Sequence, residues 1–110
     1  MSVHLGIRWA DGTYEVPTGI GQRSASVWSN IARDLALPLI AQIEMNGWPL
    51  IDAENLEQLI AEFERMAVHF AASEPADRLG TDFCPSDQAK AFARHLGRLR
   101  GQSGWEADLG

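Results

Sequence analysis

The sequence predicts an α+β domain in which an N-terminal β-hairpin packs on three or four helices. Residues Val3 to Ala10 alternate between large apolar side chains and others, which is the period of a half-buried strand. Residues Asp52 to Ala72 carry apolar side chains at three- and four-residue spacing, which is the period of a helix with one buried stripe. The chain has 110 residues, 45% of them apolar and 22% charged, which is an ordinary composition for one globular domain.

The hairpin is the first predicted element. Asp11-Gly12 follows the first strand directly, and this dipeptide tolerates the positive φ angles of a tight turn. Thr13 to Val16 then forms the returning strand. Pro17 has no backbone N–H for the strand ladder. We therefore expect the strand to end at Pro17 and residues 17–24 to form a loop.

Two helices are expected next, separated by a proline. Ser24 or Ser26 can cap a helix that runs to about residue 37. Its predicted buried face carries three apolar residues at helical spacing, namely Val27, Ile31 and Leu35, with Trp28 beside them and also expected in the core. Pro38 interrupts this helix but suits the first turn of another, so a short helix is expected from Pro38 to Met45.

The longest helix is predicted over about residues 53–72. Asp52 is placed to cap the free N–H groups of its first turn. Its apolar residues fall on one stripe, which we expect to form much of the core: Leu56, Leu59, Ile60, Phe63, Met66, Ala67 and Phe70.

A last helix is predicted from Asp87 to about Arg100, with Ser86 as its cap. Gly101 is expected to end it. The residues that follow are polar apart from Trp105 and Leu109. We therefore expect a single globular domain over residues 1–101 and a loosely ordered C-terminal tail over residues 102–110.

The net charge of −6 is unevenly distributed. From Asp34 to Glu64 the chain has seven acidic residues and no basic one, whereas residues 88–100 carry four Lys or Arg and no acid. These segments are typical of the solvated faces of two surface helices, which can attract each other. An acidic protein is repelled by phosphate backbones, so the charge disfavours nucleic acid as the main partner.

The sequence does not favour an enzyme. His4, His69 and His95 have no second His, Cys or acid at metal-ligand spacing, and we predict no metal site and no cofactor. Cys84 lies just ahead of a predicted helix and has no CxxC partner. A small enzyme or ligand-binding domain that uses Cys84 or a histidine remains an alternative.

The expected location is the cytoplasm, with a bacterium or phage as the default source. No apolar run approaches the roughly 20 residues that a membrane-spanning helix needs. The first residues, MSVHLGIRW, lack the basic start and apolar middle of a secretory signal. A single cysteine cannot form an internal disulfide.

The outer side of the longest helix and the nearby Trp48 form the candidate contact surface. Small apolar residues lie there among acids, and exposed tryptophans are common in binding hot spots. The residues predicted to contact a partner are Trp48, Glu54, Glu57, Ala61, Glu62, Glu64 and Val68. A solvated face is the simpler interpretation of the same pattern.

Two functional hypotheses of different classes follow from these features. The first is a small acidic module that neutralises or occludes a basic partner protein, by analogy of size and charge with immunity, antitoxin and anti-defence proteins. The second is a structural or assembly protein that acts as a homo-oligomer, for example a homodimer.

Overall fold

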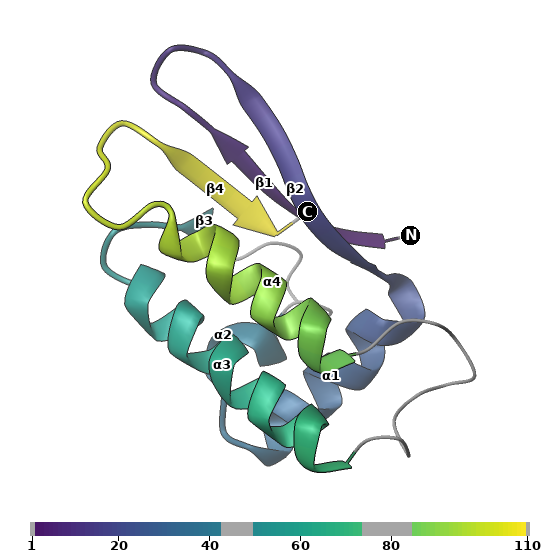
Figure 1. Cartoon of the computed structure of the whole chain (residues 1–110). Helices are drawn as coiled ribbons and strands as arrows, with labels where there is room; N and C mark the ends of the chain where they lie inside the picture. Colours follow the sequence, from purple (N-terminus) through teal and green to yellow (C-terminus); the bar gives the residue numbers. More distant parts are fainter. Residues whose placement is uncertain (1, 43–49, 74–84, 110) are drawn as a thin grey trace.

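The fold is α+β, with the predicted N-terminal hairpin. The computed structural model describes residues 2–42, 50–73 and 85–109, and in these residues helices lie on one side of an antiparallel sheet (Figure 1). The elements follow in the order β1 (Ser2–Arg8), β2 (Tyr14–Gly21), α1 (Gln22–Asp34), α2 (Pro38–Ala41), β3 (Leu50–Ile51), α3 (Leu56–Ser73), α4 (Pro85–Gly97) and β4 (Glu106–Leu109).

The hairpin turn forms where Asp11-Gly12 predicted it. Gly12 has a φ of 90°, a conformation that a residue without a Cβ adopts at little cost. The Asp11 carboxylate accepts a hydrogen bond from the Thr13 backbone N–H at 2.9 Å. The Trp9 N–H donates to the Thr13 carbonyl at 2.8 Å and closes the turn.

The C-terminal residues form a strand inside the sheet, so the prediction of a loosely ordered tail over residues 102–110 was wrong for this part. The strand order is β2-β1-β4-β3, which places β4 between β1 and β3. Leu5 pairs with Leu109 and Ile7 with Ala107, and all four side chains are buried. The tail is ordered because its apolar residues complete the inner face of the sheet.

Strand β2 continues past Pro17 to Gly21, so the prediction of a loop over residues 17–24 was also wrong. Two residues of β2, Val16 and Pro17, lie opposite the single residue Gly6 of β1, because Leu5 pairs with Thr18 and Ile7 with Glu15. Such a β-bulge interrupts the ladder locally, and β2 is an edge strand. Proline is tolerated in both settings since no ladder bond is required of its nitrogen.

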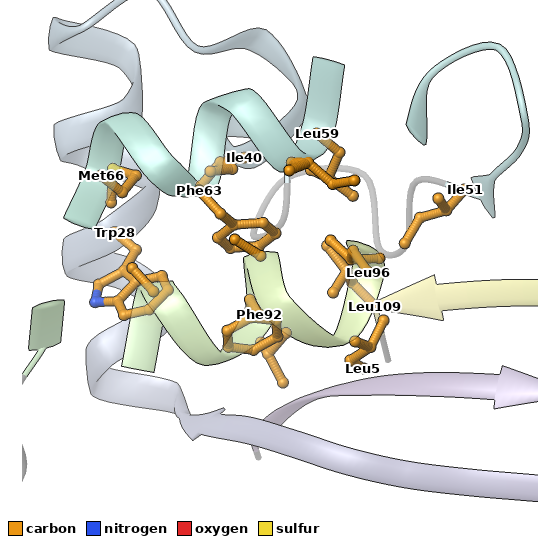
Figure 2. Close-up of a cluster of buried hydrophobic side chains, with 14 of the residues drawn as sticks. Leu5, Trp28, Ile40, Ile51, Leu59, Phe63, Met66, Phe92, Leu96 and Leu109 are labelled. Atoms are coloured by element: carbon orange, nitrogen blue, oxygen red, sulfur yellow. The ribbon is translucent and has the colours of Figure 1, made fainter. Parts of the chain in front are cut away.

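The predicted stripe of α3 is confirmed as the centre of the core. All seven of its apolar residues are buried: Leu56, Leu59, Ile60, Phe63, Met66, Ala67 and Phe70. Figure 2 shows Phe63 of α3 and Phe92 of α4 side by side, and their rings stack with centroids 4.7 Å apart. The Trp28 ring approaches Phe63 edge-on, with centroids 6.3 Å apart.

The buried face of α1 agrees in part with the predicted one, because Trp28 is buried and Ile31 and Leu35 pack partly buried against the core. Val27 is exposed, whereas Trp28 and Ala32 are buried. Ser29 is buried too, and its hydroxyl donates to the Ser26 carbonyl at 3.1 Å. The bulk of Trp28 decides the orientation, because its ring fills the space between α3 and α4.

The helix ends follow the predicted signals only in part: α1 begins at Gln22, so neither Ser24 nor Ser26 caps it, and α4 ends at Gly97 instead of near Arg100. Asp52 Oδ1 accepts the backbone N–H groups of Glu54 and Asn55, each at 2.9 Å, and thereby caps the turn that leads into α3. Helix α4 begins at Pro85 rather than Asp87, so Ser86 lies inside its first turn. Proline suits this position because the first N–H of a helix has no intrahelical partner.

Helices α1 and α4 contact the sheet, and α3 packs on α4, α2 and α1 (Figure 1). Two of the surfaces that no described element covers carry the most exposed large apolar side chains, Val68 and Tyr14. One is the outer side of α3. The other is the face of the sheet that points away from the helices.

Candidate functional site

Four of the predicted contact residues form one exposed stripe along α3. Glu57, Ala61, Glu64 and Val68 recur at helical spacing and all are exposed. Val68 is 69% exposed, more than any other large hydrophobic side chain among the described residues. Glu54 is exposed in the turn before the helix. We call Glu54, Glu57, Ala61, Glu64 and Val68 the α3 surface.

Glu62 does not belong to this surface, which corrects its place in the prediction. Its side chain is only 4% exposed. One carboxylate oxygen accepts the backbone N–H groups of Leu39 and Ile40, each at 3.0 Å. The other accepts the Gln58 side-chain amide at 3.0 Å. The carboxylate therefore caps the first turn of α2 instead of facing solvent.

Glu57 is exposed but already has a basic partner within the chain. The Arg100 guanidinium donates two hydrogen bonds to its carboxylate, at 2.6 and 2.8 Å. These bonds lower the pKa of Glu57 below its ordinary value and raise that of Arg100. The acidic and basic segments of the sequence thus meet here, as expected. The charge that the α3 surface offers to a partner comes mainly from Glu54 and Glu64.

A groove of about 470 Å³ borders the α3 surface. The connection between α1 and α2 lines one side and the first three turns of α3 line the other, through Leu35, Ala36, Leu37, Pro38, Gln58, Ala61, Glu62 and Arg65. Ala61 belongs to both the groove and the α3 surface. Contact with a partner along α3 would therefore extend over this depression.

Ala36, on the rim of this groove, has a left-handed backbone with a φ of 58°. It ends α1 in a Schellman motif, in which the Leu37 N–H donates to the Ala32 carbonyl at 2.7 Å and the Ala36 N–H to the Arg33 carbonyl at 3.2 Å. Glycine is the usual residue at this position, and an L-residue there stores on the order of 1–2 kcal/mol of strain.

The histidines do not converge on one site. His4 lies exposed on β1, and His69 packs beside Phe70 with ring centroids 5.7 Å apart. His95 is half-buried on α4, 3.2 Å from the Arg98 guanidinium, which forms an ion pair with Glu15 at 2.9 Å. Within the described ranges, no three His, Cys, Asp or Glu residues are grouped to hold a metal ion. Trp48 and Cys84 lie outside the described residues.

The side of the sheet away from the helices is a second candidate surface, which the sequence analysis missed. It carries the exposed residues His4, Arg8, Tyr14, Val16, Glu106 and Asp108, and we call these residues the open sheet face. The missed signal was the alternation of exposed and buried residues over Glu106–Leu109. Four residues are too few to identify a strand when the neighbouring strand is a hundred residues away in the sequence.

Two glycines let side chains lie flat against the open sheet face. A Cβ at Gly6 would lie 2.5 Å from the Tyr14 hydroxyl oxygen and 3.0 Å from a carboxylate oxygen of Asp108. A Cβ at Gly19 would lie 2.5 Å from Cδ2 of His4. Tyr14 and His4 therefore extend over neighbouring strands at glycine positions, which gives the face a low relief.

No protein-family model matches the chain, and comparison with curated proteins and with solved structures gives no match either. Among the described helices, none is both long enough and apolar enough to cross a membrane.

Proposed function

We propose that this protein is a small acidic protein-binding module that occludes a basic partner protein through the α3 surface. The observation that carries the proposal is the exposure of Val68, at 69%, on the same stripe as Glu64 and Ala61. An apolar side chain surrounded by polar and charged residues is the usual composition of a contact surface with a hot spot.

The charge of the chain supports a basic partner. The net charge is −6, and the α3 surface carries the exposed acids Glu54 and Glu64. Acidic residues of this kind accelerate encounter with a basic surface, while buried apolar contacts supply most of the affinity. By size and charge the protein is comparable with immunity and antitoxin proteins, and a cytoplasmic location would suit that role.

The test begins with Val68→Asp, which places a charge at the most exposed apolar position of the α3 surface. The tagged protein is used to retain partners from a native lysate of the source cells, and the retained partner is then purified. Val68→Asp should weaken the complex at least about tenfold. Val27→Asp, which changes another exposed valine on α1, is the matched control and should bind as wild type.

The electrostatic part of the proposal needs a separate measurement. The double variant Glu54→Lys/Glu64→Lys should slow association with the purified partner about tenfold or more at low salt and less at physiological salt. Asp34→Lys/Asp87→Lys changes the net charge by the same amount away from α3 and is the control. Equal association rates for the two variants would exclude α3 as the steering surface.

A further inference from the structure

We propose that the open sheet face binds a second copy of this chain and forms a weak symmetric homodimer. This interface is separate from the α3 surface, so it goes beyond the proposed function. The apolar part of the face consists of Tyr14 and Val16, which are 56% and 47% exposed. The described helices all lie on the opposite side of the sheet, so no described helix covers these two residues (Figure 1).

The charges on the face are arranged in two halves. Glu106 and Asp108 lie on β4, and Arg8 lies beside them on β1, directly opposite Glu106 in the strand pairing. The Arg8 guanidinium carbon lies 5.9 Å from the centroid of the Tyr14 ring on β2. One half of the face is therefore acidic, and the other is cationic and aromatic.

This division is complementary to itself. Consider a two-fold axis that runs parallel to the strands, above the border between β1 and β4. Rotation about this axis places the acidic half of each copy over the cationic and aromatic half of the other copy. Since Arg8 and Glu106 are at the same level along the strands, Arg8 of each copy then faces Glu106 of the other. Asp108 of each copy faces the other copy's Gly6, where the Tyr14 hydroxyl lies. Isologous contacts of this kind produce a closed dimer.

A uniformly basic partner fits this face less well, because Arg8 would repel it. The flatness that Gly6 and Gly19 give to the face suits a second sheet, since aligned sheets pack at about 10 Å spacing with nearly parallel strands. The sheet edge is a poorer contact. Strand β2 carries Pro17 in its bulge, and β3 at the other edge has two residues; both are features that block pairing between edges.

The size of the face limits the strength of the dimer. The face is as long as the seven-residue strand β1 and three or four strands wide, so it measures roughly 24 by 15 Å. Two such faces bury less than about 1,200 Å² in total, which is the range of weak and transient complexes. We expect a dissociation constant on the order of 100 µM.

Sedimentation equilibrium from about 5 to 500 µM tests the proposal. The average mass of the wild type should rise above the monomer mass of 12.1 kDa with concentration. Arg8→Glu makes the face wholly acidic and Glu106→Arg/Asp108→Arg makes it wholly basic, so each variant alone should dimerise at least about tenfold more weakly. An equimolar mixture of the two should associate again, because the opposite faces then complement each other.

Circular dichroism of each variant distinguishes a loss of the dimer from a loss of the fold. A wild type that stays at 12.1 kDa at the highest concentration would overturn the proposal. So would a mixture of two folded variants that remains monomeric. A dimer that dissociates on Val68→Asp but not on Arg8→Glu would place the contact on α3 and would equally overturn it.

Discussion

The carboxylate of Glu62 accepts a hydrogen bond from the backbone N–H of Ile40 at 3.0 Å, and so joins the middle of α3 to the first turn of α2. Leu39 donates to the same oxygen. Helix α2 has four residues, and its first N–H groups have no partner within the helix. Glu62 thus supplies from a distant element the cap that the local sequence of α2 lacks.

Replacement of this carboxylate should destabilise the protein. Glu62→Ala leaves two backbone N–H groups without an acceptor in a buried place, and we expect a loss of about 2–3 kcal/mol in the free energy of unfolding. Urea denaturation measures it. Glu64→Ala, two residues along on the exposed side, should change stability by no more than about 0.5 kcal/mol. If the two variants are equally stable, the cap contributes nothing.

Ala36→Gly should stabilise the protein, although it removes a methyl group. The left-handed φ of 58° is strained for alanine and not for glycine. After the greater flexibility of glycine in the unfolded chain is subtracted, we expect a gain of roughly 0.5–1 kcal/mol. Ala61→Gly, in the exposed middle of α3, is the control and should instead lose about 1 kcal/mol. A loss in both variants would contradict the role of the Schellman motif.

Leu109→Ala should be among the more destabilising single changes near the C-terminus. Leu109 is 0% exposed and pairs with Leu5 in the sheet. Truncation of such a residue leaves a cavity and costs about 2–5 kcal/mol. Thermal unfolding followed by circular dichroism would show the change. Glu106→Ala, at the exposed start of the same strand, should be nearly neutral, and similar transitions for both variants would mean that β4 adds little.

His95 should make the protein less stable as the pH falls. Burial lowers the pKa of His95 below its ordinary value of 6.5, and Arg94 and Arg98 lower it further, while Glu15 acts in the opposite direction. Below about pH 7 the unfolded chain therefore binds a proton that the folded chain still refuses, so the free energy of unfolding decreases toward the folded-state pKa.

The variant His95→Gln removes this proton uptake. Urea denaturation at several values from pH 7.5 to 5.5 should give a smaller loss of stability for His95→Gln than for wild type. His69→Gln, which replaces a histidine on α3 outside the Glu15–Arg98 pair, serves as the control. The assignment fails if His95→Gln retains the full dependence on pH.

Much of α3 and of the hairpin was predictable from the sequence. The stripe from Leu56 to Phe70 is regular over four turns, so the buried side of α3 follows from local periodicity. Asp11-Gly12 and Asp52 act within three residues of their own position in the chain, and the turn and the cap formed where they were predicted. The exposure of Glu54, Ala61, Glu64 and Val68 was predictable for the same reason.

Several of the errors concern residues whose environment comes from distant parts of the chain. Pro17 lies inside a strand because Gly6 of β1 stands opposite a bulge. Glu62 is buried because α2, more than twenty residues earlier, places its free N–H groups beside it. For this reason Glu62 is not part of the contact surface predicted on α3, whereas Ala61 and Val68 are exposed there.

The sequence by itself determined where α3 lies, which side of it is apolar, and where the hairpin turns, because these properties depend on spacings of two to four residues. The tertiary structure alone decided that the last strand pairs with the first, that Arg100 neutralises Glu57, and that Arg8 stands beside Glu106 on an open face. Contacts of this kind join residues 43 or more positions apart. Periodicity carries no information about them, since they depend on how the apolar sides pack around one core.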